Sequence, residues 1–351
     1  MGYELNEKIR DLKPYDPISG DFSVRLDANE SFIPVPRQIL QKISDAVLSI
    51  PYNRYPDPLA KELCESFGRY YHINSDLVTA GNGSDELISV ICSAFLMKGD
   101  TMLTLSPDFS MYRFYASIAE AKTELYFKNP DMSIDVDKLI AMVNGSNAKL
   151  VIFSNPCNPT SLGLKREEVR RLVTSVKALV VLDEAYMDFW SESLLNEVES
   201  YDNLMILRTC SKAFAMAGIR LGFAVANRKL TNAMKAVKSP YNVNTLTQKA
   251  GSVVLQEGQW LRSCIEEIKA SRDMLYERMR IFESNYAQRM HVYPSVTNFL
   301  FVKISQADDV YYELLKSGIA VRYFGDFLRI TAGTKEENEK FLQAFEKAIR
   351  L

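Results

Sequence analysis

The sequence has little of the features that mark several large classes of protein. Lys and Arg number 42 and Asp and Glu 44, giving a formal net charge of −2. This balance lacks the excess positive charge with which nucleic-acid-binding proteins neutralise phosphates. No apolar run approaches the roughly 20 residues of a membrane span. The charged opening, MGYELNEKIRDLKPYDP, is unlike a signal peptide. We therefore expect no nucleic-acid partner and no membrane partner.

Histidine and cysteine are too few or too scattered to indicate a metal site. Only two histidines are present, His72 and His291, and neither has another His or Cys at ligand spacing. A Ser-His-Asp hydrolase would depend on one lone histidine. The cysteines are odd in number and never spaced as CxxC (Cys64, Cys92, Cys157, Cys210 and Cys264). We expect reduced thiols in a cytoplasmic protein, and no bound metal.

The chain does have the length and composition of a two-domain globular protein. It has 351 residues, of which 47% are hydrophobic. Between residues 77 and 226, short apolar runs alternate with helical patterns, which predicts an α/β domain whose mostly parallel sheet is covered by helices. After Pro240 the pattern predicts a smaller α+β domain. We predict an N-terminal segment at 1–35 that packs with the small domain, a large domain at 36–240 and a small domain at 241–351.

Three polar side chains follow predicted buried strands. Asn158 lies in NPCNPT, Asp183 follows the apolar run ALVVL, and Lys212 follows NLMILR. Open α/β sheets bind ligands at the carboxyl ends of their strands. A desolvated lysine can attack a carbonyl carbon, and a carboxylate at the end of a buried strand needs a partner. Taken singly, each has a structural alternative: a proline-stiffened loop, a helix N-cap and a surface lysine.

A glycine-containing turn, Gly81-Asn-Gly-Ser-Asp-Glu86, lies between a predicted strand and a predicted helix. Free N–H groups at the start of a helix favour an anion, so this turn suits a phosphate. A distant alternative is the fingerprint of an NAD-dependent oxidoreductase, but Glu86 occupies its third glycine position. The structural alternative is a turn in which Ser84 caps the helix.

Two arginines, Arg322 and Arg329, lie in predicted strands of the small domain within AVRYFGDFLRIT. Arginine binds carboxylate or phosphate through two parallel hydrogen bonds. The alternative for each is a solvated position on the face of a strand.

The order of NPxNPT, Asp-Glu-Ala-Tyr and Ser-Lys followed by Gly-x-Arg-x-Gly is more specific than any single motif. It resembles the fold-type I aminotransferases that use pyridoxal 5′-phosphate (PLP), and most closely the histidinol-phosphate aminotransferases. The resemblance covers nearly the whole chain, including LDANES, RYPDP, GNGSDELI and KSPYNVN. It implies a homodimer with a shared active site that converts histidinol phosphate and 2-oxoglutarate to imidazole acetol phosphate and glutamate, in histidine biosynthesis. The alternative is a PLP-dependent lyase that decarboxylates a phosphorylated amino acid such as threonine phosphate.

The resemblance also implies roles for individual residues. Lys212 would carry PLP and move a proton, Asp183 would pair with the ring nitrogen, and Tyr186 would bind the ring's phenolate oxygen with Asn158. Phe109 would stack on the ring. The PLP phosphate would be held by Gly83, Ser84, Asp85, Ser211 and Arg220, with Tyr55 supplied by the neighbouring subunit. Substrate contacts would come from Tyr15, Asn29, Arg322 and Arg329.

Four positions depart from the family pattern. Ser161 and Ala215 each replace a usual glycine, and Phe109 stands where a tyrosine is usual. Only Tyr323–Phe327 separates Val-Arg from Leu-Arg-Ile-Thr, where many relatives carry a longer loop. The last departure lies beside the predicted substrate site.

Overall fold

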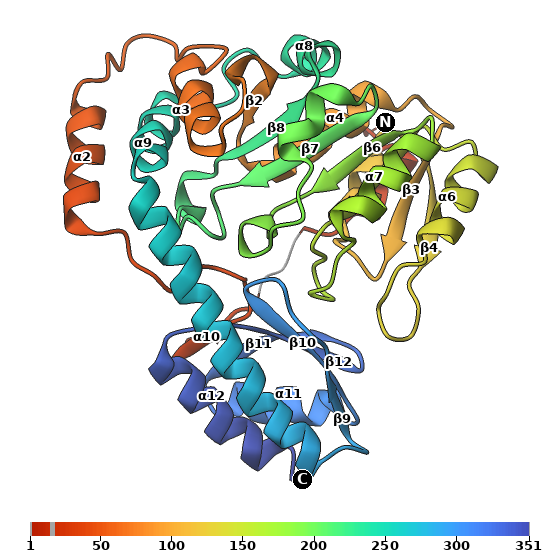
Figure 1. The fold of residues 1–351 in the computed structure, drawn as a ribbon, viewed down its shortest axis with the longest axis vertical. Helices are drawn as coiled ribbons and strands as arrows, with labels where there is room; N and C mark the ends of the chain where they lie inside the picture. The colour runs from red at the N-terminus through yellow and green to blue at the C-terminus, as the bar shows by residue number, and fades with distance from the viewer. Residues whose placement is uncertain (1, 15–17, 351) are drawn as a thin grey trace.

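Two β-sheets organise the chain (Figure 1). The computed structural model describes residues 2–14 and 18–350. The strands of the larger sheet are β2 (Val78–Gly81), β3 (Thr101–Ser106), β4 (Lys122–Phe127), β5 (Leu150–Ser154), β6 (Leu179–Asp183), β7 (Leu204–Thr209) and β8 (Gly222–Ala226). Those of the smaller sheet are β1 (Val24–Leu26), β9 (Met290–Val292), β10 (Phe299–Ile304), β11 (Ile319–Phe324) and β12 (Phe327–Thr331). The strand orders are β2-β8-β7-β6-β5-β3-β4 and β1-β11-β12-β10-β9.

The larger sheet is parallel from β4 to β7, and β8 runs antiparallel to both β7 and β2. Its central strands are buried on both faces. In β6, Val180 and Leu182 pack into one hydrophobic cluster, whereas Leu179 and Val181 pack into another. A strand buried on both faces has no polar side to alternate, which explains the continuous apolar runs in the sequence.

Helices cover both faces of the larger sheet, and this confirms the predicted α/β fold class. Apolar side chains of α4, α5 and α8 form one cluster with the sheet, and those of α3, α6, α7 and α9 form the other. These helices are α3 (Lys61–Tyr71), α4 (Gly83–Phe95), α5 (Met111–Ile118), α6 (Val136–Gly145), α7 (Arg166–Ser175), α8 (Arg228–Val237) and α9 (Thr245–Gln256). Short 3₁₀ helices are η1 (Ser75–Leu77), η2 (Met187–Phe189), η3 (Leu195–Ser200) and η4 (Ala217–Ile219).

One face of the smaller sheet packs against α10 (Gly258–Asn285), α11 (Ala307–Lys316) and α12 (Lys335–Ala348). Its cluster joins Leu300, Leu328 and Ile330 of the strands to Leu275 of α10 and Phe341 of α12. The opposite face carries Arg329, which donates a hydrogen bond to Asn158 in the loop that follows β5 of the larger sheet. Figure 1 shows α10 running from the side of the larger sheet down to the smaller one.

The N-terminal segment contacts both parts of the molecule. Strand β1 pairs in parallel with β11, whereas α1 (Glu7–Arg10) lies near α5, where Lys8 Nζ donates to the Ile118 carbonyl across 3.1 Å. Helix α9 packs on α3 and on α2 (Arg37–Leu48). The division at 35 and 240 stays a prediction. In the part of the chain that the structure describes, no helix is long and apolar enough to span a bilayer.

Candidate active site

The ends of several strands of the larger sheet meet at one edge. Ser154 at the end of β5 is opposite Asp183 at the end of β6, and Asp183 is opposite Leu207 of β7. Gly222, which begins β8, is paired with both Gly81 of β2 and Thr209 of β7. The loops that leave these strands therefore carry Asn158, Asp183, Lys212 and the glycine turn to the same edge.

Asp183 is buried, with only 5% of its surface exposed. Its Oδ2 accepts a hydrogen bond from the Tyr112 hydroxyl (2.8 Å), and its Oδ1 accepts one from the Ala185 N–H (3.2 Å). Burial raises the pKa of Asp183 to about 7; the Tyr112 hydrogen bond opposes that rise, and the carboxylates of Asp85 and Asp108 add to it. The charges around Asp183 are negative, so the position favours a cationic ligand group.

Asp183 is not a helix N-cap, because β6 includes it and the next helix, η2, begins only at Met187 after Tyr186. The N-cap alternative for Ser84 is also wrong. Helix α4 begins one residue earlier, at Gly83, with Asn82 as its N-cap. Glu86 Oε2 accepts a hydrogen bond from the Asn82 N–H (2.6 Å), so this carboxylate pairs with the backbone donor at the start of the turn.

Lys212 follows β7 and lies at the same edge. Its Nζ donates to the Ala28 carbonyl (3.0 Å) and lies 6.0 Å from the centre of the Tyr186 ring. Burial lowers the pKa of Lys212 to about 8, and the positive charge of Arg329 adds to that shift. An amine with such a pKa is partly neutral near pH 8, so it can act as a nucleophile or as a base.

Tyr186 connects the large sheet to the N-terminal segment. Asn29 Nδ2 donates to the Tyr186 hydroxyl oxygen (2.9 Å), and Asn29 Oδ1 accepts a hydrogen bond from Thr331 Oγ1 of β12 (3.0 Å). Burial raises the pKa of Tyr186 to about 12. Tyr186 is therefore protonated at neutral pH, and its own hydrogen remains a donor.

The smaller sheet contributes arginine to the same place. Arg329 is buried, and it donates from Nη1 to Asn158 Oδ1 and from Nη2 to the Asp27 carbonyl. Arg322 is opposite Arg329 in the register of β11 and β12. Directly opposed residues in an antiparallel pair share a face, so both guanidinium groups lie on the face that meets Asn158.

The glycine turn forms an anion-binding arrangement. Gly83 has φ 81°, and a Cβ there would lie 2.9 Å from Arg220 Nη2. Arg220 pairs with Asp85 (3.5 Å) and donates to Ser211 Oγ (3.4 Å). The structure thus brings together Gly83, Asp85, Ser211 and Arg220 at the start of α4, where Ser84 also lies. Backbone N–H groups there, beside a guanidinium, suit a phosphate.

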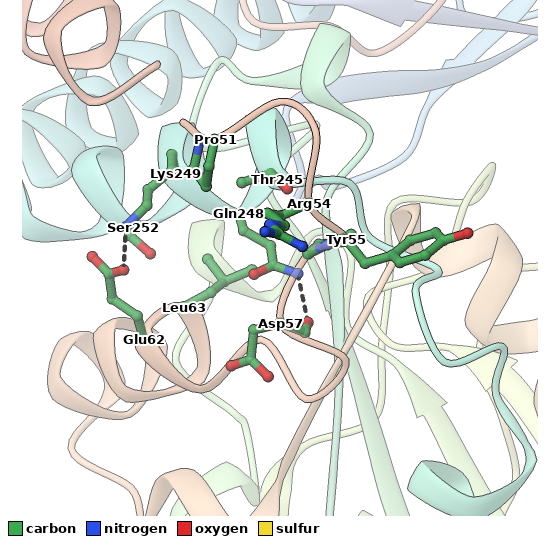
Figure 2. Close-up of a pocket in the computed structure, with 11 residues that line it drawn as sticks. Pro51, Arg54, Tyr55, Asp57, Glu62, Leu63, Thr245, Gln248, Lys249 and Ser252 are labelled. Atoms are coloured by element: carbon green, nitrogen blue, oxygen red, sulfur yellow. Dashed lines mark hydrogen bonds and ion pairs between the residues drawn. The ribbon is translucent and has the colours of Figure 1, made fainter. Parts of the chain in front are cut away.

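Of the remaining predicted residues, Tyr55 lies apart from this set, Phe109 lies beside it, and Tyr15 is outside the described residues. Tyr55 is 80% exposed, and its ring stacks on Tyr241 with 4.6 Å between ring centres. Figure 2 shows the Tyr55 side chain directed away from the pocket lined by Arg54 and Gln248. Phe109 precedes α5 and meets Tyr112 edge to face at 5.5 Å. Tyr15 lies outside the described residues.

Sequence reasoning missed the residues that hold the site residues in place through hydrogen bonds. Tyr112 holds Asp183, and half-buried Asp108 accepts hydrogen bonds from Ser154 Oγ and from the Phe109 N–H. Ser154 Oγ in turn accepts the Asn158 N–H (3.0 Å). The sequence carried no signal for the Tyr112–Asp183 and Asp108–Ser154 pairs, because the members of each are far apart in the chain and meet only when the sheet forms.

A buried ionic cluster was missed for the same reason. Arg208 of β7 pairs with Glu184 (2.8 Å) and Asp188 (2.9 Å), and Asp188 also accepts the Tyr71 hydroxyl (2.8 Å). Tyr186 lies between the two carboxylates in sequence, so the cluster fixes the segment that carries it. In residues 2–14 and 18–350, no three His, Cys, Asp or Glu side chains are grouped to hold a metal ion.

The fold is that of the fold-type I aminotransferases. The histidinol-phosphate aminotransferase of Sinorhizobium meliloti, solved in complex with PLP, shares the fold with a TM-score of 0.86 at 22% identity, over 99% of this chain and 97% of that one. The chain belongs to the family of class I and II aminotransferases, whose model matches residues 23–345. The predicted family and enzyme class are thereby confirmed.

Curated relatives of the chain within this family are histidinol-phosphate aminotransferases. The chain is 38% identical to the histidinol-phosphate aminotransferase of Clostridium kluyveri, over 99% of each protein. It is 37% identical to the histidinol-phosphate aminotransferase of Clostridium novyi, over 96% of this chain and 95% of that protein.

Proposed function

We propose that the chain is a PLP-dependent aminotransferase of histidine biosynthesis that transfers the amino group of histidinol phosphate to 2-oxoglutarate, giving imidazole acetol phosphate and glutamate. The pairing of Arg322 with Arg329 carries the proposal of an anionic substrate. Two arginines on one face concentrate positive charge there, and arginine binds a carboxylate or a phosphate through two parallel hydrogen bonds. The two Clostridium relatives supply the substrate class.

The residues present fit PLP. Buried Asp183 has its pKa raised to about 7 among negative neighbours, and a protonated ring nitrogen would supply the missing positive charge. The space where Gly83 lacks a Cβ, beside Arg220, lies at the start of α4, where a phosphate is favoured. When bound, PLP supplies an electron sink for the electrons of the substrate's α-carbon.

The chain's own groups then have distinct tasks. Lys212 would hold PLP through Nζ, and the same amine, released when the substrate's amino group takes its place, would take the proton from the substrate's α-carbon and return it. Asp183 would keep the ring nitrogen protonated. By the family resemblance, Tyr186 and Asn158 would donate hydrogen bonds to the phenolate oxygen of the ring, and Phe109 would cover one ring face.

The substrate's charged groups are bound from the smaller sheet and the N-terminal segment. Arg329 binds the carboxylate of 2-oxoglutarate and shares the phosphate of histidinol phosphate with Arg322. Asn29, which donates a hydrogen bond to Tyr186, is assigned to the same substrate set. Tyr15 belongs to this substrate set by family resemblance.

A homodimer is part of the proposal. Tyr55 exposes 80% of its surface in the single chain, and its stacking on Tyr241 holds the ring outward. By the family resemblance, this hydroxyl would bind the PLP phosphate of the neighbouring subunit. A cytoplasmic location is also proposed, and it is supported by five free cysteines, all of them buried.

The test is a half-reaction screen on the PLP-loaded protein. Histidinol phosphate and glutamate should each change the absorbance of bound PLP, and histidinol, which lacks the phosphate, should do so far more slowly. Release of carbon dioxide from threonine phosphate, with no response to histidinol phosphate, would replace this proposal with the lyase.

A further inference from the structure

The connection between β11 and β12 is a two-residue turn made by Gly325 and Asp326. Phe324 and Phe327 flank the turn and are partners in the antiparallel register. Gly325 has φ 63°, a conformation that two-residue hairpin turns require and that glycine adopts without strain. Because the turn fixes the register, Phe324 lies on the same face as Arg329.

Two aromatic rings flank the Arg329 guanidinium. Its central carbon lies 5.5 Å from the centre of the Phe299 ring and 5.7 Å from that of Phe324. Phe299 belongs to β10 and Phe324 to β11, the two strands on either side of β12, so the rings approach from opposite sides. Both distances are within the range of attraction between a cation and an aromatic face.

The two rings differ in exposure. Phe299 is fully buried and meets the Tyr186 ring edge to face at 5.1 Å. Phe324 keeps 37% of its surface exposed, so it forms the outer wall of the Arg329 position. The hydrogen bonds to Asn158 and to the Asp27 carbonyl hold the two terminal nitrogens of Arg329, and the two rings contact the faces of its guanidinium.

We propose that Phe324 is a positioning residue for substrate binding, whose ring holds the Arg329 guanidinium in place and shields it from water. A guanidinium held in one orientation loses less freedom when it binds an anion, and a drier one attracts the anion more strongly. The inference rests on the proposed role of Arg329 in binding the substrate's anionic group. It does not depend on which amine is the donor.

The experiment compares Phe324→Leu, Phe324→Tyr and Tyr323→Leu in the PLP-loaded enzyme. Leucine keeps apolar volume without the aromatic face, and tyrosine keeps the face. Tyr323 is a matched control: it is the next residue on the strand, 39% exposed, and stacks on Tyr311 of α11. KM and kcat are measured with glutamate, 2-oxoglutarate and histidinol phosphate.

Phe324→Leu should raise KM for each anionic substrate by about 2- to 30-fold, the range of a cation–aromatic contact, while kcat stays nearly unchanged. Phe324→Tyr and Tyr323→Leu should resemble the wild type. A merely structural role would lower kcat or the amount of folded enzyme instead.

The inference is overturned if Phe324→Leu leaves KM unchanged, or if Phe324→Tyr raises it equally. A wild-type enzyme that uses glutamate and 2-oxoglutarate but ignores histidinol phosphate would contradict the proposed donor alone, and the comparison with glutamate would still decide the role of Phe324. A wild-type enzyme inactive on all three substrates would overturn both.

Discussion

Tyr112 donates its phenolic hydrogen to Asp183 Oδ2 across 2.8 Å, reaching from α5 to the end of β6. Burial and the Asp183 charge hold the pKa of Tyr112 well above its usual value, so the phenol remains a donor. The bond favours the ionised carboxylate, whereas burial disfavours it, and the result is a pKa of about 7 for Asp183. The carboxylate is thus poised to pair with a cation that the coenzyme brings.

Asp183→Asn separates this role from a structural one. Because the pKa of Asp183 is 3.8 before burial and about 7 in the folded chain, its ionisation costs stability as pH rises from about 4 to 7. Without PLP, the variant should therefore be at least as heat-stable as the wild type at pH 8. With PLP it should lose most of its turnover, since the ring nitrogen loses its partner. Thermal unfolding and kcat are the readouts, and near wild-type turnover would make Asp183 structural.

The pKa of Lys212 sets the pH at which the chain takes up PLP. Only the neutral amine attacks the coenzyme's aldehyde, so the rate of covalent attachment should rise with pH and level off above about 8. The same lowered pKa makes this group's contribution to stability increase from about pH 8 to the ordinary lysine value of 10.5.

Arg329→Gln tests the electrostatic part of this shift, because the Arg329 charge lowers the pKa of Lys212. It should move the midpoint of the attachment rate to higher pH. Rapid-mixing absorbance measurements on the PLP-free protein give both midpoints. A wild-type midpoint near 10.5 would contradict the burial of Nζ.

Arg322→Ala tests the phosphate end of the substrate site. Removing one charge-assisted hydrogen bond costs about 1.5–3 kcal/mol, so KM for histidinol phosphate should rise about 10- to 150-fold. KM for 2-oxoglutarate, whose carboxylate is assigned to Arg329, should change little. Steady-state kinetics with both substrates give the comparison. A nearly silent substitution would make Arg322 a solvated strand residue.

Much of the fold could be predicted because the central strands are apolar on both faces and alternate with helices. Strand β4 was harder to predict from the sequence. This edge strand carries Lys122 and Glu124 and exposes part of its surface, so its apolar pattern is weak. Ser161 and Ala215, which stand where the family resemblance leads us to expect glycine, both have positive φ, 61° and 54°. Their side chains accept a strained conformation that costs about 1–2 kcal/mol.

The candidate site was predictable only in its motif-bearing part. Residues at strand ends, such as Asp183 and Lys212, could be placed because strand order brings those ends together. Tyr112 and Phe324 could not, because their roles depend on packing between distant segments and on the register that the Gly325 turn imposes.

The shared site predicts recovery of activity from two inactive variants. Tyr55→Ala and Lys212→Ala should each be severely impaired as pure proteins. When they are unfolded and refolded together, hybrid dimers form in which one site has both residues intact, and partial activity should return. The same variants refolded separately and then assayed in one cuvette are the control. An active monomer at the assay concentration would contradict the proposed dimer.

The most direct test of the central claim is to fix PLP on the protein with borohydride and map the labelled peptide by mass spectrometry. Reduction makes the bond between PLP and its lysine permanent, so the label records which amine holds the coenzyme. We expect a yellow protein and a single labelled site at Lys212. A label on another lysine, or no chromophore after PLP is added, would contradict it.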